Sequence, residues 1–231
     1  MSRPLLRDSI DGGAPSARHD ALMRRDAWSA TLLAACLAAA VAMSIGHERR
    51  VAAELGACAP PFTDAASGDT WQSGSSSGAP AWQLTRDAAL GDRANLPDSG
   101  NLRYEATLLS PSFRVPAGGA DVVFDHHRAY SWANTMGALE IAIDGGPFED
   151  VGDAGATFSS GGYDSRSLAA NPLGFRAAWA ASPDVATHTR LTLPPTAAGK
   201  SVRLRFHAGS AGTGDSLPGW SIENIRCALG D

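Results

Sequence analysis

From about residue 100 onward, hydrophobic and polar residues alternate in short runs. In the segment LEIAID (139–144) every second residue is Leu or Ile, and in VRLRFH (202–207) Val, Leu and Phe alternate with Arg and His. Successive side chains of a β-strand point to opposite faces, so this spacing is typical of strands with one buried and one solvated face. Shorter runs of the same kind occupy residues 108–115, 122–127, 190–194 and 220–227.

Turn-forming residues separate these runs, as in Asp-Gly-Gly at 144–146 and Pro-Pro at 194–195. After Ala59 no segment has the hydrophobic spacing of an amphipathic helix. Many short strands with frequent turns predict an all-β fold, an antiparallel β-sandwich. We expect the Gly/Ser-rich stretch 67–80 to be a loop.

An uncharged segment of 20 residues, 27–46, lies near the N-terminus. As a helix it would be roughly 30 Å long, which is the thickness of a bilayer's hydrocarbon core. Arg18, Arg24 and Arg25 precede it and only Arg49 and Arg50 follow it closely, which favours a membrane anchor with its N-terminus in the cytoplasm.

Two other interpretations of this segment remain open. If translation begins at Met23, the segment is typical of a signal peptide, with Ala-Val-Ala at 40–42 as its cleavage site. Residues 33–36, Leu-Ala-Ala-Cys, resemble a lipobox, although the residues after Cys36 stay apolar. All three interpretations export the rest of the chain. We therefore expect a protein of the bacterial cell envelope, either held in the inner membrane through residues 27–46 or secreted.

The predicted organisation has four parts. Residues 1–26 mix Arg, Asp, Gly and Pro without apolar periodicity and are expected to be disordered. The anchor or signal segment 27–46 and a stalk, 47–61, follow. Residues 62–231 form the β-sandwich domain.

The cysteines are consistent with export. Cys36 lies in the apolar segment, which leaves Cys58 and Cys227 at the two ends of the predicted domain. In an oxidising compartment such a pair is most simply a disulfide, and closing so long a loop contributes about 4–5 kcal/mol in the chain-entropy treatment. The alternative is two unrelated buried thiols.

The charge of the domain argues against nucleic acid as a partner. From Ala59 onward the chain has 12 basic and 18 acidic residues, a difference of −6. An acidic domain repels phosphate backbones, and no basic stripe interrupts the negative charge.

The run Asp125-His126-His127 resembles a metal-dependent phosphoesterase motif. On a strand, however, His126 and His127 point to opposite faces and cannot easily bind one ion. We expect one half-buried and one surface histidine, and a hydrolase using Asp125, His126 and His127 is a remote alternative. The carboxylates at 149–150 follow a turn and are expected to be solvated. The sequence also lacks Gly-x-Ser-x-Gly, His-Glu-x-x-His and a phosphate-binding glycine loop, so we predict that the protein is not an enzyme.

Seven short motifs occur in a familiar order: Leu-Ser-Pro-Ser-Phe (109–113), Phe-Asp-His (124–126), Leu-Glu-Ile with Asp-Gly-Gly (139–146), Gly-Gly-Tyr (161–163), Ala-Trp (178–179), Val-Arg-Leu-Arg-Phe (202–206) and Gly-Trp-Ser-Ile-Glu-Asn-Ile (219–225). Together they resemble the jelly-roll accessory domain of bacterial exported proteins, found beside immune-inhibitor-A-type metallopeptidases and related in shape to MAM and galactose-binding-like modules. The resemblance covers residues 62–227. It implies a jelly-roll sandwich with an ancillary role in adhesion or in recognition of glycans or proteins.

The chain departs from that family at two places. Residues 131–137 replace an acidic residue and Tyr-Asp-Gly, and residues 209–211 replace Gly-x-Asp. Hard oxygen ligands for calcium are therefore missing, and we expect no metal and no cofactor.

These observations predict a non-catalytic exported module that binds an extracellular glycan or protein. The suggested contact patch is Tyr130, Trp132 and Asn134, because aromatic rings beside an amide suit sugar stacking and hydrogen bonding. The alternative for these aromatic residues is packing of a loop onto the sandwich. The alternative for the protein is a structural envelope protein that displays a stable domain and has no small-molecule ligand.

Overall fold

The computed structural model describes residues 70–76, 78–87, 91–99, 101–129, 134–212 and 217–228. The predicted disordered segment, the anchor or signal segment and the stalk lie outside this part of the chain. Within it, no helix has the length and hydrophobicity needed to span a bilayer.

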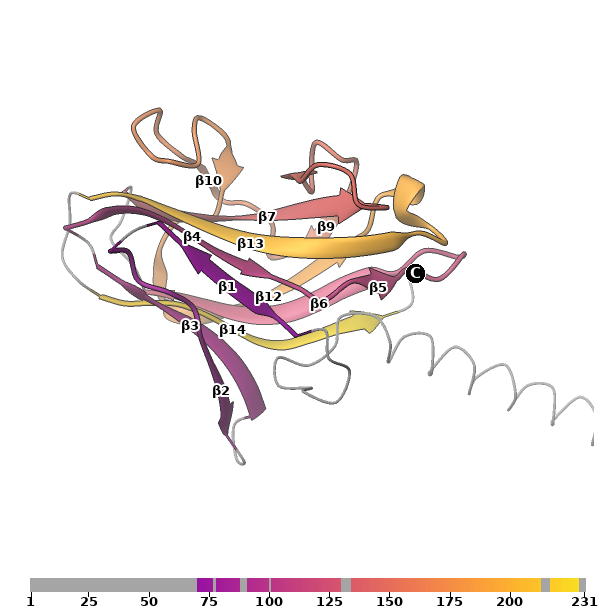
Figure 1. Cartoon of the computed structure of the whole chain (residues 1–231), viewed down its shortest axis with the longest axis horizontal. Coiled ribbons are helices and arrows are strands. Elements are labelled where there is room, and N and C mark those ends of the chain that lie inside the picture. Colours follow the sequence, from indigo (N-terminus) through magenta and orange to yellow (C-terminus); the bar gives the residue numbers. More distant parts are fainter. Residues whose placement is uncertain are drawn as a thin grey trace, which may run out of the picture. The chain divides into compact units, whose positions relative to one another are not determined.

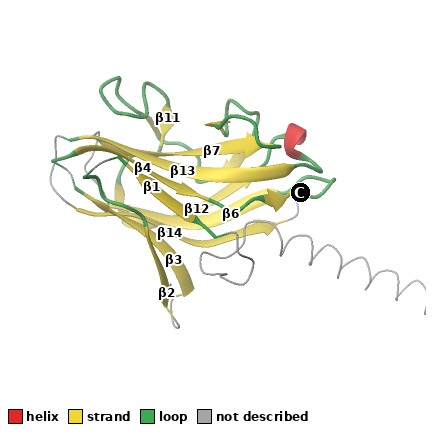
Figure 2. Ribbon diagram, viewed as in Figure 1, coloured by secondary structure: helices red, strands yellow, loops and turns green. Residues whose placement is uncertain are grey.

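Two antiparallel sheets face each other (Figures 1 and 2). Sheet A has the strand order β1 (Gln72–Ser75), β4 (Arg103–Leu109), β13 (Ser201–Ala211), β7 (Thr135–Ile143) and β8 (Glu149–Asp150), and β5 (Phe113–Arg114) also pairs with β13. Sheet B has the order β2 (Gln83–Asp87), β3 (Gly91–Asp98), β14 (Leu217–Ala228), β6 (Asp121–Ala129), β12 (Ser182–Thr192) and β9 (Thr157–Ser160). Two short strands, β10 (Ser165–Arg166) and β11 (Ala177–Ala178), form a separate pair, and Pro195–Ala197 form a 3-10 turn.

The long strands alternate between the sheets along the chain. Strands β4, β7 and β13 belong to sheet A, while β6, β12 and β14 belong to sheet B. This alternation is that of a jelly roll, so the predicted all-β jelly-roll sandwich is confirmed. The N-terminal helix that was predicted to precede it lies outside the described residues.

Aromatic rings fill the space between the sheets. Trp220 is 1% exposed, and its ring lies 5.9 Å from the rings of both Trp179 and Phe206. A Cβ atom on Gly137 would come within 2.5 Å of the Trp220 ring, so β7 can pass the indole only where it carries no side chain.

The turn predicted at Asp-Gly-Gly (144–146) forms directly after β7, in the connection to β8. Asp144 and Gly145 have φ values of 49° and 75°, and the Gly146 amide donates to the Ile143 carbonyl at 2.9 Å. Positive φ at both central residues is the geometry of a type I′ turn, which matches the twist of the flanking strands.

The expectation of a loop over residues 67–80 was wrong for Gln72–Ser75. These residues form β1, an edge strand paired with β4 from Gln72 opposite Leu109 to Ser75 opposite Ala106. Trp71 is buried against Phe206, with 6.2 Å between ring centroids, and this contact holds the strand on the sheet. Backbone pairing and one buried anchor therefore outweigh the low strand propensity of Gly and Ser.

Candidate binding groove

Asp125, His126 and His127 do not form a common site. His126 points into the core at 1% exposure, whereas Asp125 and His127 lie on the outer face of sheet B. Asp125 bonds instead to His188 Nδ1 at 2.7 Å and to Asn224 Nδ2 at 2.8 Å. The three side chains of the remote hydrolase alternative therefore have no shared space in which to act.

His126 is more buried than the sequence predicted. Desolvation, with a smaller contribution from the charge of Arg128, lowers the pKa of His126 to about 3. Its Nδ1 accepts a hydrogen bond from Trp220 Nε1 at 3.2 Å. The neutral imidazole is thus a polar member of the aromatic core, and the expectation of a half-buried histidine was wrong for this residue.

The suggested contact patch is described only at Asn134, because Tyr130 and Trp132 lie outside the described residues. The Asn134 carbonyl accepts hydrogen bonds from Asn171 Nδ2 at 2.7 Å and from the Ala211 amide at 2.9 Å. The patch stays a prediction. The same is true of the disulfide, since Cys227 lies at the edge of the core on β14 but Cys58 is outside the described residues.

The outer face of sheet A is half covered. Residues 161–181, which we call the covering segment, include β10 and β11 and lie over the β7 side of the sheet (Figure 1). Asn171 Nδ2 donates to the Gly209 carbonyl at 2.8 Å, and Trp179 pairs with Gly137 through two backbone hydrogen bonds. Over β13 and β4 the segment reaches only the end at Gly209 and Arg103, where Arg103 Nη1 donates to the Ala170 carbonyl at 2.6 Å. Further along these strands, at Thr107, Arg205 and His207, no described residue of the covering segment lines the face.

A charge network lies where the covered and open halves meet. Glu140, on β7, accepts from Arg176 of the covering segment at 2.6 Å and also pairs with Arg205 of β13. Burial alone would raise the pKa of Glu140, but hydrogen bonds from His207, Arg205 and Arg176 outweigh it and lower the pKa to about 2. Arg176 also pairs with Asp150, whose side chain is only 10% exposed. The expectation that the carboxylate of residue 150 is solvated was therefore wrong.

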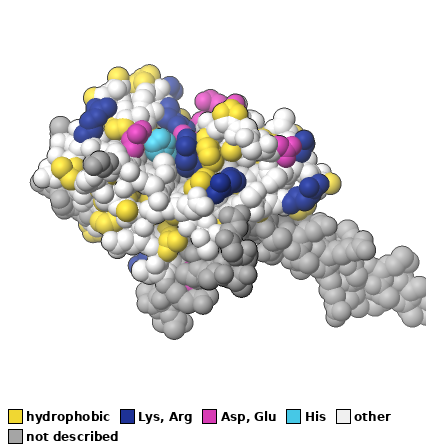
Figure 3. All heavy atoms as spheres, viewed as in Figure 1, with side chains coloured by type: hydrophobic (Ala, Val, Ile, Leu, Met, Phe, Trp, Pro, Cys, Tyr) yellow, Lys and Arg dark blue, Asp and Glu magenta, His cyan; other side chains and the backbone are white. Residues whose placement is uncertain are grey.

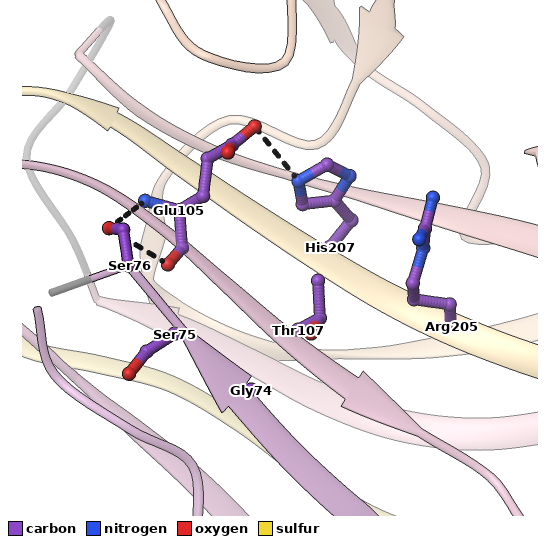
Figure 4. A pocket seen from close by; sticks show the side chains of 7 residues that line it. All are labelled: Gly74, Ser75, Ser76, Glu105, Thr107, Arg205 and His207. Carbon is purple, nitrogen blue, oxygen red and sulfur yellow. Dashed lines mark hydrogen bonds and ion pairs between the residues drawn. The ribbon is translucent and has the colours of Figure 1, made fainter.

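The open half is hollowed into a groove with a volume of about 490 Å³. Figure 4 shows its lining, which comes from three neighbouring strands and from the residue that follows β1: Gly74, Ser75, Ser76, Glu105, Thr107, Arg205 and His207. The register brings Thr107 next to Gly74 on one side and next to His207 on the other. A Cβ atom on Gly74 would lie 2.8 Å from Thr107 Oγ1, so the missing side chain gives the groove its depth.

The charged side chains of the groove are held in place before any ligand arrives. His207 lies between two carboxylates, with Nδ1 3.3 Å from Glu140 and Nε2 3.5 Å from Glu105. The Arg205 guanidinium, paired with Glu140, also stacks over the Phe148 ring at 4.2 Å. Figure 3 shows acidic, histidine, basic and hydrophobic side chains next to one another on this face. Binding here requires little further ordering of side chains.

The side chains of the groove can both donate and accept hydrogen bonds. Its lining has one carboxylate, one guanidinium, one imidazole and three hydroxyl groups. In the described ranges, no three His, Cys, Asp or Glu side chains are grouped so that they could hold a metal ion. This arrangement is suited to binding a polar molecule of low net charge.

The sequence did not identify this groove, although one signal was present. Arg203, Arg205 and His207 are the polar members of the alternating run in β13, so they must share the solvated face. The residues that complete the groove come from β1 and β4, roughly 100 or more positions away in the chain, and only the strand order brings them together.

Comparison with solved structures gives several weak alignments over most of this chain. The carbohydrate-binding module TmCBM61 in complex with β-1,4-galactotriose aligns at 11% identity and a TM-score of 0.42, covering 74% of this chain and 91% of its own. A family 11 carbohydrate-binding module from Clostridium thermocellum, in complex with a mixed-linked tetrasaccharide, aligns at 13% identity and 0.36, covering 68% and 87%. The K1 cleaved adhesin domain of Lys-gingipain from Porphyromonas gingivalis aligns at 13% and 0.30, covering 73% and 88%.

No family model and no curated protein matches the chain. The specific resemblance to the accessory domain beside immune-inhibitor-A-type peptidases is therefore not confirmed. At these identities and TM-scores the alignments carry no argument about this chain, and what the groove binds must be argued from its own side chains.

Proposed function

We propose that this protein is a non-catalytic recognition module that binds a glycan in the groove on the outer face of sheet A. The observation that carries the proposal is the groove itself: an open, polar hollow with fixed donors and acceptors on a rigid sheet. Its volume of about 490 Å³ lies within the usual range for small-molecule sites.

The chemistry of the lining favours a polyhydroxylated ligand. Sugar hydroxyl groups both donate and accept, and the groove supplies an acceptor in Glu105, a donor in Arg205 and a hydroxyl in Thr107 that can do either. A phosphate-bearing polymer would require an excess of cations, whereas this groove balances one carboxylate against one guanidinium. An apolar ligand would leave these polar groups without partners.

Direct binding measurements on the full-length protein test this proposal. Calorimetric titration with neutral polysaccharides is expected to give saturable binding, whereas a polyuronate and single-stranded RNA are expected to bind weakly or not at all. Glu105→Gln should weaken neutral-glycan binding about ten-fold or more, because a hydrogen bond to a charged group contributes about 1.5–3 kcal/mol.

The matched control is Glu223→Gln. Glu223 is likewise a strand carboxylate, paired with Arg93 at 2.8 Å, but it lies on the outer face of sheet B. It should leave the affinity unchanged. If neither a panel of neutral glycans nor a charged polymer binds, the alternative of a structural envelope protein without a small-molecule ligand is supported instead.

We further propose that the domain is exported, with residues 27–46 as an anchor or a cleaved signal. The support is the length of the uncharged segment and its flanking arginines. Mass spectrometry of the mature N-terminus, together with cell fractionation, distinguishes the two forms. Recovery of the intact protein from the cytoplasm would contradict both.

The predicted patch at Tyr130, Trp132 and Asn134 belongs to the same binding hypothesis. Trp132→Ala should weaken glycan binding if the patch contributes. Unchanged affinity in this variant, together with a loss in Glu105→Gln, would assign binding to the groove alone.

A further inference from the structure

The outer face of sheet A has a second hollow, of about 200 Å³. It is lined by the β7–β8 turn, by Phe148 and by polar side chains near one end of β13, among them Ser112, Ser201 and Arg203. Its floor is again sheet A, because Ala142 and Arg203 are opposite each other in the pairing of β7 with β13. The groove and this hollow therefore share one strand.

The two hollows adjoin at the stack of Arg205 on Phe148. Arg205 lines the groove, Phe148 lines the second hollow, and the two side chains are in contact at 4.2 Å. Arg203, Arg205 and His207 are alternate residues of β13, so their side chains project from one face in a row. From Arg203 to His207 this row extends about 13 Å at the usual rise of a strand.

The surroundings favour a path along β13 towards Arg203 for a long ligand. The covering segment occupies the β7 side of the groove through Arg176, which bonds to Glu140, and it closes the end of β13 beyond His207, where Asn171 donates to the Gly209 carbonyl. Along β13, in contrast, Gly145 and Gly146 at the edge of the second hollow carry no side chain that could obstruct a chain passing over it.

Arg203 is available as a donor in the second hollow. Its Nε donates to the Ser110 carbonyl at 3.0 Å, which fixes the guanidinium, and among the described residues no carboxylate pairs with it. Nearby, Ser112 and Ser201 are joined by a hydrogen bond of 2.7 Å between their hydroxyl groups. These groups can bond to sugar hydroxyls in the same way as those of the groove.

We propose that the second hollow is a subsite of the same binding surface, and that the ligand is an extended neutral oligosaccharide lying along β13 across the Arg205–Phe148 stack. This inference rests on the proposed function, because it assumes that the groove binds a glycan. A single sugar ring cannot reach from His207 to Arg203, so several consecutive units are recognised together.

The experiment is titration of the full-length protein with ladders of neutral β-1,4-linked gluco- and galacto-oligosaccharides of two, four and six units. For the ladder that binds, the six-unit chain should bind at least ten-fold more tightly than the two-unit chain. Arg203→Ala should remove most of this gain and leave the affinity for two units unchanged.

Two further variants make the outcome interpretable. Gly74→Leu fills the groove from the edge strand and should abolish binding of every length, since its new side chain occupies the space beside Thr107. Arg226→Ala is the matched control for Arg203→Ala, because Arg226 also bonds to one backbone carbonyl, at 3.2 Å, but lies on sheet B. It should change nothing.

The failures are distinguishable. If Gly74→Leu abolishes binding but affinity does not increase with length, or Arg203→Ala has no effect, the second subsite is refuted and the groove survives. If Arg203→Ala weakens two units as much as six, the residue acts through the fold and the subsite is again refuted. If no ladder binds, this inference is overturned, and the proposed function is overturned with it when the panel of neutral polysaccharides also fails to bind.

Discussion

The buried imidazole of His126 should make the stability of this domain sensitive to mild acid. In the unfolded chain a histidine has a pKa near 6.5, whereas burial lowers the pKa of His126 in the folded protein to about 3. Between these values the unfolded state binds one more proton than the folded state, so acid favours unfolding. Stability from this residue is fully present above pH 6.5 and is lost as the pH falls towards 3.

The size of the effect follows from the two pKa values. Each pH unit below 6.5 removes about 1.4 kcal/mol from the free energy of unfolding until the pH approaches 3. Lowering the pH from 7.5 to 5 should therefore cost about 2 kcal/mol through this residue alone. In this window most carboxylates remain ionised, so His126 is well separated from their titration.

Urea unfolding at pH 7.5 and pH 5, followed by tryptophan fluorescence, measures the loss. His126→Gln retains an acceptor for Trp220 Nε1 but cannot titrate, so this variant should lack the fall of about 2 kcal/mol. His127→Gln is the matched control, because His127 is the adjacent residue on the opposite face of β6, and it should keep the fall.

Proton NMR gives an independent reading on the unmodified protein. The ring protons of His126 should not titrate between pH 8 and 4.5. The reasoning is refuted if this ring titrates near pH 6.5, or if His126→Gln retains the full loss of stability.

Three further outcomes are expected. Gly137→Ala should destabilise the fold by about 1–3 kcal/mol, because the added methyl group overpacks against Trp220. The control is Gly118→Ala, which should have little effect because a Cβ atom there meets nothing within 4 Å. Equal midpoints of urea unfolding for the two variants would contradict this prediction. Glu140→Gln should lower the free energy of unfolding by up to about 3 kcal/mol at pH 7, because Arg176 and Arg205 lose a largely buried partner. This difference from the wild type should shrink as the pH falls from 4.5 towards 2, where Glu140 itself becomes protonated. The control is Glu149→Gln at an exposed carboxylate, and an equal loss of stability in that variant would refute the prediction. If Cys58 and Cys227 are bonded, reduction or Cys58→Ser should lower stability by up to about 4–5 kcal/mol. Thiol counting by mass spectrometry under denaturing conditions would contradict the bond if both Cys58 and Cys227, in addition to any retained Cys36, are found as free thiols.

Local patterns in the sequence were sufficient for the fold class and for much of the core. Alternation in β7 and β13 identified which side chains face inward, because burial on one face leaves a period of two. The type I′ turn after Ile143 was predictable, since its Asp-Gly pair is suited to positive φ. These features depend only on neighbours along the chain.

The features that were not predicted depend on strand order. Glu140 looked like an outward polar residue of β7, and its burial results from the covering segment and from Arg176, 36 positions away. Strand β1 has no hydrophobic alternation, and it exists because β4 offers an edge and Trp71 reaches the core. The groove combines both effects, so no single stretch of sequence contains its signature.

Gly74 has a consequence for how this surface can diversify. The hollow beside Thr107 exists because a residue at the rim of the sheet, remote from the packed aromatic rings, ends at its Cα atom. A larger residue there would reshape the cavity floor without touching the interior. A substitution at this one position would therefore change the shape of the ligand site by displacing the Thr107 side chain, while the aromatic packing between the sheets stays as it is.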